Sequence, residues 1–208
     1  MGWCVLAIID YGLGNVRSVL NALEHIGAKA SITRDAAVLK SADGLILPGV
    51  GAFGAGMSRL RQYGLADLIT RMVGEGRPLL GICLGFQMLM RSSTEDGETE
   101  GLHLMPHPVV RLPVEARLPH YGWSQVISES REKAPALMKG LEGDWFYFVH
   151  SYGVVRPQAP MVGGITRYDG CELLALVEHG NVFGTQFHPE KSGEAGLEML
   201  RNFVDLVR

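Results

Sequence analysis

The fold is decided by the stretch Cys4-Val5-Leu6-Ala7-Ile8-Ile9-Asp10, in which six apolar residues in succession are closed by an acid and a glycine-containing turn. A continuous apolar run of this length is typical of a strand buried on both faces, as in a parallel sheet. After Asn15, a residue suited to a helix N-cap, apolar residues recur at helical spacing until Gly27 ends the pattern. The first 27 residues therefore predict one βα unit.

The same alternation continues through the first half of the chain. We expect strands at residues 28–33, 44–47 and 79–82, and a helix over residues 65–73. Over residues 102–186, short apolar runs are broken by Pro and Gly, which predicts antiparallel strands. The sequence thus predicts an α/β fold with an open, mostly parallel central sheet flanked by helices, and an additional antiparallel strand region.

Two features of the C-terminal part are specific. Residues 173–177 and 182–185 flank Gly180-Asn181, which predicts a hairpin, and apolar residues at helical spacing over residues 197–207 predict a closing helix. The chain contains no internal repeat, linker or low-complexity segment. Residues 1–208 are therefore expected to form a single domain.

The composition excludes several classes of protein. With a formal net charge of −3 and no basic block, the chain offers no electrostatic footprint for nucleic acid or for an acidic membrane surface. No apolar run is long enough to be a membrane span. Three widely spaced cysteines fit reduced thiols better than a disulfide framework. We expect a cytoplasmic protein that binds neither nucleic acid nor a membrane.

The sharpest local feature is Gly81-Ile82-Cys83-Leu84-Gly85-Phe86-Gln87, which follows a predicted strand and opens an apolar helical stretch. It is a cysteine form of the nucleophile elbow, a strained strand-to-helix turn that exposes one side chain at the carboxyl end of a sheet. A helix N-terminus favours the thiolate form of such a cysteine. Cys83 is therefore the candidate nucleophile, the alternative being a small buried filler between strand and helix.

A thiolate nucleophile needs a proton carrier, and the stretch Gly184-Thr185-Gln186-Phe187-His188 ends a predicted strand in a histidine. Glu190 follows two residues later. We interpret His188 as the acid and base, and Glu190 as the carboxylate that orients the imidazole. A His-x-Glu pair is more often a surface hydrogen bond. Its place at a strand end, where open α/β sheets put their sites, favours the catalytic interpretation.

A glycine-rich turn, Pro48-Gly49-Val50-Gly51-Ala52-Phe53-Gly54, follows the third predicted strand. Its letters match the dinucleotide-binding pattern G-x-G-x-x-G, but it follows the third strand rather than the first, and no acid stands at a strand end about 20 residues later. Such a turn can instead aim backbone N–H groups at a developing oxyanion, as acyl transfer requires. We favour this role over a bare structural turn and over nucleotide binding.

No metal site or cofactor is expected. His103 and His107 are four residues apart, but Pro106 between them disrupts a regular helix, so they are interpreted as loop histidines. Cys4 and Cys171 have no partner at metal-ligand or redox spacing. Both are interpreted as structural residues.

Together these motifs resemble those of the class I glutamine amidotransferases, in the order and on the elements that this family uses. The set is most similar to the glutaminase subunits of imidazole glycerol phosphate synthase. The resemblance covers almost the whole chain, because further segments match as well: Asp10-Tyr11-Gly12-Leu13-Gly14-Asn15, His120-Tyr121-Gly122-Trp123, Phe148-Val149-His150-Ser151-Tyr152 and Lys191-Ser192.

The resemblance implies an enzyme that hydrolyses L-glutamine to L-glutamate and ammonia through a thioester on Cys83, with His188 and Glu190 in the roles given above. It implies that the backbone N–H groups of Val50 and Leu84 stabilise the oxyanion. It also implies a set of residues that bind glutamine: Gly49, Gly51, Gln87, His150, Ser151 and Tyr152.

A partner is implied as well. A separate (β/α)8-barrel cyclase subunit, in a heterodimer, would use the ammonia to form imidazole glycerol phosphate and aminoimidazole carboxamide ribotide in histidine biosynthesis. Asn15, Trp123 and Lys191 match positions that the family places toward this partner. The alternatives for them are a helix cap, a buried aromatic residue and a solvated cation.

The chain departs from the family pattern at Tyr121 and Ser124, where Met and Asn are common. The departure concerns the partner face, so a glutaminase subunit of the same fold that feeds a different synthase or cyclase stays open. A non-catalytic module with this fold is a third reading, and the intact set of Cys83, His188 and Glu190 argues against it.

Overall fold

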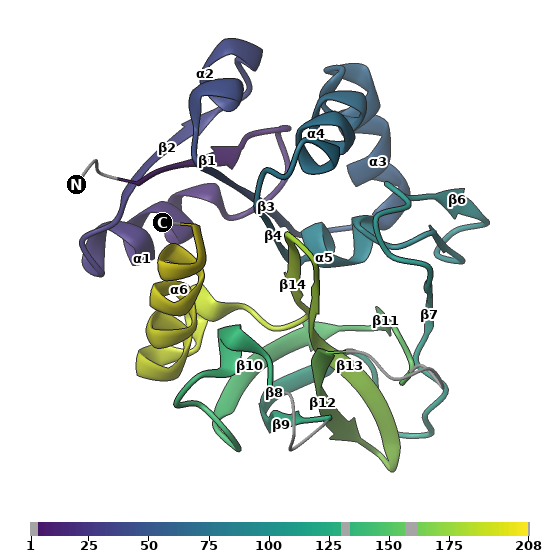
Figure 1. Ribbon diagram of the computed structural model, residues 1–208. Coiled ribbons are helices and arrows are strands. Elements are labelled where there is room, and N and C mark those ends of the chain that lie inside the picture. Colours follow the sequence, from purple (N-terminus) through teal and green to yellow (C-terminus); the bar gives the residue numbers. More distant parts are fainter. Residues whose placement is uncertain (1–3, 130–133, 157–161, 208) are drawn as a thin grey trace.

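The computed structural model describes residues 4–129, 134–156 and 162–207, and the structural statements below concern these residues. A mixed sheet runs through the molecule with helices on both of its faces (Figure 1). Its strands are β1 (Val5–Ile9), β2 (Lys29–Thr33), β3 (Gly44–Gly49), β4 (Leu79–Cys83), β9 (Ile127–Ser128), β12 (Val162–Tyr168), β13 (Cys171–His179) and β14 (Val182–Thr185).

The order of these strands in space is β2-β1-β3-β4-β14-β13-β12-β9. The first five are parallel to their neighbours, and β13, β12 and β9 extend the same sheet with antiparallel pairing. This confirms the predicted α/β fold with a mostly parallel sheet and an added antiparallel region. The chain reaches the centre of the sheet twice, first with β4 and again, about 100 residues later, with β14.

Two smaller sheets lie beside the antiparallel part. One pairs β8 (His120–Gln125) with β10 (Trp145–His150), and the other has the order β11-β7-β5-β6. The bounds of the strands in the second sheet are Ser92–Ser93 for β5, Thr99–Glu100 for β6, Pro108–Arg111 for β7 and Tyr152–Gly153 for β11.

Helices occupy both faces of the central sheet. They are α1 (Val16–His25), α2 (Ala36–Ser41), α3 (Phe53–Gln62), α4 (Leu65–Gly74), α5 (Leu84–Met88) and α6 (Gly193–Val207), with short 3-10 helices η1 (Ala136–Met138) and η2 (Pro189–Lys191). Buried residues of α1 and α6 pack on one face, and those of α2, α3 and α4 pack on the other. Successive strand residues alternate between these two cores, since side chains on a strand point to opposite faces.

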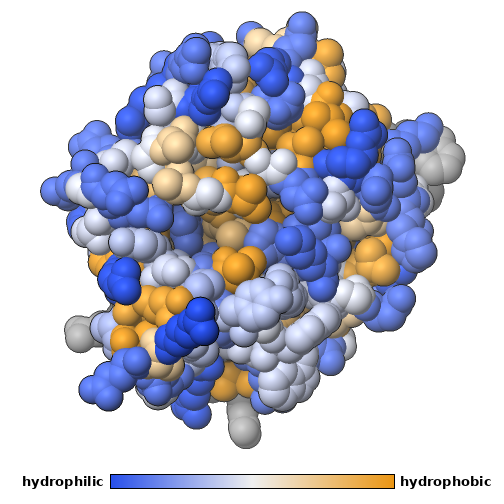
Figure 2. All heavy atoms as spheres, turned by 180° about the vertical axis from the view of Figure 1, so that it is seen from behind, coloured by the Kyte–Doolittle hydropathy of each residue, from blue (hydrophilic) through white to orange (hydrophobic). Residues whose placement is uncertain are grey.

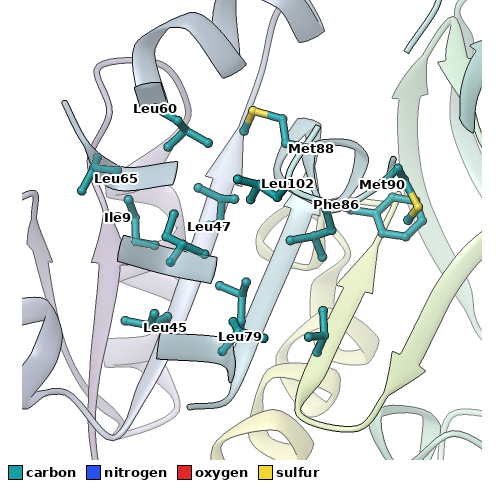
Figure 3. Packing of buried hydrophobic residues seen from close by; sticks show 14 of the residues in the cluster. Ile9, Leu45, Leu47, Leu60, Leu65, Leu79, Phe86, Met88, Met90 and Leu102 are labelled. Atoms are coloured by element: carbon teal, nitrogen blue, oxygen red, sulfur yellow. The ribbon is translucent and has the colours of Figure 1, made fainter. Parts of the chain in front are cut away.

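The core on the α3 and α4 side is built almost entirely from aliphatic residues and methionines. Ile9, Leu45 and Leu47 project from the strands toward Leu60 of α3 and Leu65 of α4 (Figure 3). All five are fully buried or nearly so. Burial of each large aliphatic side chain contributes about 1.5–3 kcal/mol, so the continuous apolar strands seen in the sequence are what hold both helical layers on the sheet.

The first βα unit follows the prediction with one difference. Asn15 occupies the N-cap position of α1, but its Oδ1 accepts a hydrogen bond from Ser18 Oγ at 2.8 Å and caps no backbone N–H. At the other end Gly27 has a φ of 76°, and the amides of Gly27 and Ala28 bond back to the last turn of the helix. This is a Schellman arrangement, which requires a left-handed residue and explains the glycine.

Two helices were not expected from the sequence. Asp35 accepts hydrogen bonds from the amides of Ala37 and Val38 and so caps the N-terminus of α2. Helix α3 begins at Phe53 within the glycine-rich turn, where Gly54 and Gly56 lower the helix propensity. Gly56 is needed there because a Cβ would meet Met88 Sδ at 2.7 Å, where α3 packs on α5.

The predicted hairpin and closing helix are both present. β13 pairs antiparallel with β14, His179 lies opposite Val182, and Gly180 in the two-residue turn has a φ of 60°. Helix α6 covers the predicted residues 197–207 and starts four residues earlier, at Gly193.

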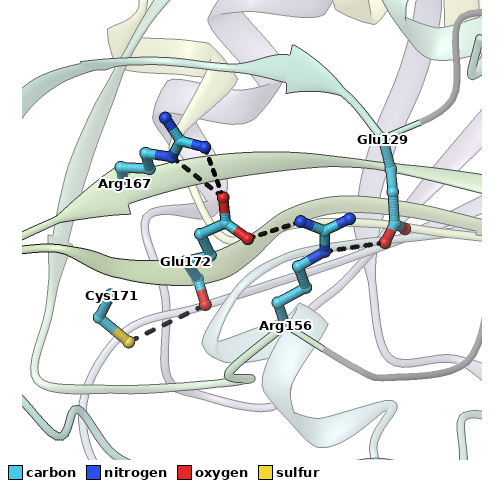
Figure 4. A network of polar contacts seen from close by, with 5 residues as sticks. All are labelled: Glu129, Arg156, Arg167, Cys171 and Glu172. Carbon is cyan, nitrogen blue, oxygen red and sulfur yellow. Dashed lines mark hydrogen bonds and ion pairs between the residues drawn. The ribbon is translucent and has the colours of Figure 1, made fainter.

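A charged network ties together the far end of the antiparallel region (Figure 4). Arg156 pairs with both Glu129 and Glu172, and Arg167 makes two hydrogen bonds to Glu172. Hydrogen bonds from Arg156 and Arg167 lower the pKa of Glu172. Because both arginines of the network are solvent-exposed, the network fixes the geometry of the strand ends more than it adds stability. Cys171 lies beside it, half-buried, where burial raises the pKa of the thiol.

The surface is of mixed polarity. Figure 2 shows a face on which apolar patches are separated by polar and charged side chains. No helix in the described part of the chain is long and apolar enough to cross a bilayer. Within residues 4–129, 134–156 and 162–207, no group of three or more His, Cys, Asp or Glu side chains could hold a metal ion.

Candidate active site

Cys83 is the last residue of β4 and lies directly before α5. Its φ of 54° and ψ of −108° are unfavourable for any residue with a Cβ, so the backbone is strained at the cysteine itself. The side chain is buried, with 6% of its surface exposed. This is the strand-to-helix turn that the sequence predicts, and the five-residue helix α5 begins directly after Cys83.

The glycines on both sides of Cys83 serve close packing rather than an unusual φ. A Cβ on Gly81 would meet Phe86 N and Leu89 Cδ1 at 2.8 Å, and a Cβ on Gly85 would overlap the carbonyl oxygen of Leu47. Neither glycine has a positive φ. The turn is therefore pressed against the end of β3, which brings the glycine-rich turn after β3 next to Cys83.

His188 follows the end of β14, the strand that pairs with β4. Its Nδ1 lies 2.8 Å from Oε1 of Glu190, and both side chains are almost completely buried. A carboxylate can only accept, so Nδ1 carries the proton and Nε2 remains for other chemistry. Nε2 has no hydrogen-bond partner among the described residues. The geometry is that of an imidazole oriented by a carboxylate.

The environment of His188 favours its protonated form. Burial of the imidazole opposes protonation, but the interactions with Cys83 and Glu190 outweigh it and raise the pKa of His188 to about 10. At neutral pH the site therefore favours an imidazolium beside the cysteine, with the carboxylate of Glu190 on the other side of the ring.

This shift predicts a pH dependence of stability. Because the pKa of His188 lies above its ordinary value of 6.5, protonation stabilises the folded state; the contribution is complete below pH 6.5 and is lost as the pH rises toward 10. We expect the free energy of unfolding of the wild type, measured by chemical denaturation, to fall between pH 7 and 10. The fall should be smaller in His188→Gln. If the free energy of unfolding fell equally steeply with pH in the two proteins, the raised pKa could not be assigned to His188.

A cavity of about 290 Å³ opens in front of Cys83 and His188. It brings together most of the residues predicted for catalysis and substrate binding. Gly49 and Glu190 do not line it, since both lie behind residues that do. The lining residues are Val50, Gly51, Cys83, Leu84, Gln87, Glu95, Pro119, Val149, His150, Ser151, Tyr152 and His188.

The glycine-rich turn forms one wall of this cavity. Gly51 has a φ of 100°, which explains a glycine there, and the Val50 side chain is 40% exposed. Gly49 is confined between the Tyr11 hydroxyl and Leu84, so that a Cβ at this position would collide with both. Burial raises the pKa of Tyr11 strongly, with a further contribution from Cys83, so its hydroxyl stays neutral.

Two residues of the site were missed by the sequence analysis. Glu95 lies in the polar segment after β5; its Oε2 accepts the backbone N–H of Phe53 at 2.8 Å, at the start of α3. Of the described residues that line the cavity, Glu95 alone has a carboxylate. Gln186 is the second, and its Nε2 lies 3.8 Å from Sγ of Cys83. Gln186 stands in the motif that ends in His188, but neither composition nor spacing predicts its contact.

The residues predicted to face a partner lie outside the cavity. Trp123 of β8 is 52% exposed and packs edge-on against Tyr147 of β10, and Lys191 has its Nζ 5.8 Å from the centre of the same Tyr147 ring. These three side chains share one surface. Trp123 is thus not a buried aromatic residue. Asn15 lies at the start of α1, a helix that contacts η2, the element in which Lys191 lies.

Sequence comparisons identify the family of the chain. A profile described as glutamine amidotransferase class-I matches residues 7–207. The imidazole glycerol phosphate synthase subunit HisH of Methanothermobacter thermautotrophicus is 48% identical over 204 residues, covering 98% of this chain and 100% of that protein. The protein of the same name from Halobacterium salinarum is 46% identical, covering 96% of this chain and 92% of that protein.

Solved structures show the same fold at lower identity. A crystal structure of a glutamine amidotransferase superposes with a TM-score of 0.75 at 23% identity, covering 97% of this chain and 98% of the other. The structure of PurLQS from Thermotoga maritima superposes with a TM-score of 0.78 at 22% identity, with all of both chains covered. From the matching profile and the full-length similarity to HisH proteins, the chain belongs to the class I glutamine amidotransferase family and, within it, to the HisH subunits of imidazole glycerol phosphate synthase.

Proposed function

We propose that this chain hydrolyses L-glutamine to L-glutamate and ammonia at Cys83, and supplies the ammonia to a cyclase subunit in histidine biosynthesis. The family relationship gives the activity as that of a glutamine amidotransferase. One observation carries the assignment of the site. The strained Cys83 and His188, which is hydrogen-bonded to Glu190, line one cavity, although they are separated by more than 100 residues in the sequence.

The reaction begins with attack of Cys83 Sγ on the side-chain amide carbon of glutamine. A carbon–sulfur bond forms, and the electron pair of the carbonyl double bond moves to oxygen. The backbone N–H groups of Val50 and Leu84, which both line the cavity, would stabilise this oxyanion. The proposal uses the imidazolium of His188 as the proton source, in agreement with its raised pKa.

The intermediate then collapses and the carbon–nitrogen bond breaks. His188 Nε2 gives its proton to the leaving nitrogen, which departs as ammonia and leaves a thioester on Cys83. A water molecule attacks the thioester while Nε2 takes up a proton, and the carbon–sulfur bond breaks to release glutamate. The sum is glutamine plus water giving glutamate plus ammonia, and both Cys83 and His188 return to their starting state. Glu190 keeps Nδ1 protonated throughout.

The residues that line the cavity are placed to bind the parts of glutamine other than the reacting amide. We assign binding of the substrate to Gly51, Gln87, His150, Ser151 and Tyr152, which line the cavity, and to the shape that Gly49 gives to the turn. The carboxylate of Glu95 supplies a negative charge for the α-ammonium group of the substrate.

Glu95→Gln tests this last assignment. The amide oxygen of Gln can still accept the Phe53 N–H, but the charge is lost, so we expect KM for glutamine to rise about tenfold with kcat changed little. Steady-state glutamate release gives both constants. Glu98→Gln, an exposed neighbour in the same segment, is the control and should keep the wild-type KM. A loss confined to kcat would contradict binding of the ammonium group.

The cyclase remains a proposal, because its contacts rest on positions rather than on a bound partner. We place it on the surface formed by Trp123, Tyr147 and Lys191, with Asn15 as a further contact. Two HisH subunits of imidazole glycerol phosphate synthase, at 48% identity over nearly the full chain, support the histidine pathway. The alternative, a glutaminase of this fold that feeds a different synthase, is not favoured by these relatives.

The function is tested by measuring glutamate release from the chain alone, with a cyclase of the histidine pathway, and with cyclase plus its ribotide substrate. We expect slow release from the chain alone and a large increase in the loaded complex, since unregulated hydrolysis wastes glutamine. No hydrolysis in any of the three arms would overturn the glutaminase assignment. Stimulation by the cyclase of another pathway, but not by this one, would overturn the pathway.

A further inference from the structure

The sulfur of Cys83 is contacted from inside the protein by a side chain to which the mechanism above gives no role. Gln186 is 1% exposed, and its backbone N–H is fixed to the carbonyl of Ala175 on β13. Its Nε2 donates to Cys83 Sγ at 3.8 Å, and its Oε1 accepts from Nε2 of Gln87 at 3.0 Å. A buried amide aimed at a sulfur can stabilise negative charge on it.

The orientation of the Gln186 amide is set by its neighbours. Gln87 Nε2 donates both to Gln186 Oε1 and to the carbonyl oxygen of Tyr152, at 2.8 Å. A backbone carbonyl can only accept, which fixes the NH2 group of Gln87 toward Tyr152 and hence toward Gln186. The oxygen of Gln186 must therefore face Gln87, and its NH2 group faces the sulfur.

The same carbonyl fixes two buried histidines. His150 Nδ1 lies 2.9 Å from Tyr152 O and must donate to it, which leaves His150 Nε2 as an acceptor. His120 Nδ1, at 3.1 Å from that nitrogen, then has to donate, and His120 Nε2 has to accept from Ser124 Oγ at 2.8 Å. Each role follows from the one before it. Burial lowers the pKa of His120 to about 4 and that of His150 to about 3, so both rings are neutral at ordinary pH.

These contacts form one continuous chain of hydrogen bonds: Ser124, His120, His150, the Tyr152 carbonyl, Gln87, Gln186 and Cys83. Its residues come from β8, β10, β11 and α5 and from the position that follows β14, elements whose arrangement Figure 1 shows. Its outer end, Ser124, is half-buried in a strand whose neighbours Trp123 and Gln125 are exposed.

We propose that this chain of hydrogen bonds positions the thiolate of Cys83, with Gln186 as the group that contacts the sulfur and Ser124 as the residue that anchors the outer end. The inference rests on Cys83 being the nucleophile of the proposed function. Deletion of the Ser124 hydroxyl leaves His120 Nε2 without its donor, which loosens every later contact up to the sulfur.

The test measures the reactivity of Cys83 without turnover. Iodoacetamide alkylates a thiolate when sulfur displaces iodide, and mass spectrometry of the full chain gives the rate at each cysteine. Cys4 and Cys171 in the same molecule report any general opening of the fold. The variants are Gln186→Met, which removes the donor at similar size, Ser124→Ala and Ser124→Thr, with Gln125→Ala as the matched control. Gln125 lies next to Ser124 on β8 and bonds to Gly143 O instead.

We expect Gln186→Met to slow alkylation of Cys83 about tenfold, because a hydrogen bond to a charged sulfur is lost. Ser124→Ala should slow it about threefold, Ser124→Thr should restore the wild-type rate, and Gln125→Ala should leave it unchanged. The double variant Ser124→Ala/Gln186→Met should react no more slowly than Gln186→Met alone, since both changes break the same chain.

Two outcomes would overturn the inference. One is an unchanged rate in Gln186→Met, and the other is a double variant in which the two losses multiply. If Gln186→Met does not fold, the comparison of Ser124→Ala with Ser124→Thr tests the inference by itself. Equal rates of Cys83 alkylation in these two variants would then overturn it. Failure of the proposed function is distinguishable, because it requires glutamine hydrolysis to persist in Cys83→Ala.

Discussion

Cys83→Ala should lower glutamine hydrolysis by roughly 10⁴-fold or more, because no other group in the cavity can form the thioester. The protein should still fold. Alanine bears the same penalty as cysteine at a φ of 54°, so the losses are the packing of the sulfur, the hydrogen bond from Gln186 and the interaction with His188. We expect a cost of less than about 2 kcal/mol in the free energy of unfolding. Glutamate release and chemical denaturation measure the two effects.

The other two cysteines are the natural controls. Cys4 directly precedes β1 and Cys171 begins β13, and neither residue lines the cavity, so Cys4→Ala and Cys171→Ala should retain wild-type turnover. A glutamine-like electrophile should label Cys83 alone in the wild type. Labelling spread evenly over the three thiols would contradict the assignment of Cys83 as the nucleophile. Turnover in Cys83→Ala close to that of the wild type would contradict it as well.

Gly49→Ala is expected to damage both stability and activity. The added Cβ would overlap the buried Tyr11 hydroxyl and would lie 2.9 Å from Leu84 Cβ and 3.0 Å from the backbone nitrogen of Gly85, so the contacts cannot be relieved by moving one flexible side chain. We expect a destabilisation of about 3 kcal/mol, as for an overpacked core. Displacement of the turn also moves the Val50 N–H, so kcat should fall by about 100-fold or more.

Gly54→Ala supplies the matched comparison, since it changes another glycine of the same motif. A Cβ at Gly54 would meet nothing nearer than Thr99 Oγ1 at 3.6 Å, and the residue lies in α3. This variant should be as stable as the wild type or more stable by about 0.4–1 kcal/mol. The double variant Gly49→Ala/Tyr11→Phe should recover part of the lost stability. A Gly49→Ala protein of wild-type stability would show that the turn does not pack as described.

The parallel part of the fold is accessible from the sequence because its strands are buried on both faces. Their apolar runs are continuous, and the structure places β1, β3 and β4 within one or two residues of the predicted bounds. Helix α3 was missed because two glycines weaken its local signal, and what stabilises it is contact with α5. The assignment of strands to three separate sheets was not predictable, since it depends on pairing between distant segments.

The candidate site likewise contains residues that the sequence predicts and residues that it does not. Cys83 and His188 stand in short motifs at strand ends, where local sequence predicts exposure to a ligand. Glu95 and Gln186 belong to the site only through tertiary contacts, to Phe53 and to Cys83. Sequence spacing carries no information about such contacts, because they arise when strands far apart in the chain become neighbours. The roles given to the site residues stay predictions until variants are measured.

The two neighbouring strands at the centre of the sheet, β4 and β14, are far apart in the sequence, and this order has a consequence for biosynthesis. β14 is inserted between β4 and β13 and leads into His188, the predicted proton carrier, while the predicted nucleophile Cys83 is made about 100 residues earlier. A nascent polypeptide on the ribosome exposes an open edge at β4 until the last part of the protein emerges, and long-range parallel pairing is slow to form. With the roles proposed for Cys83 and His188, we expect no ammonia release from an incomplete product of translation that ends before His188.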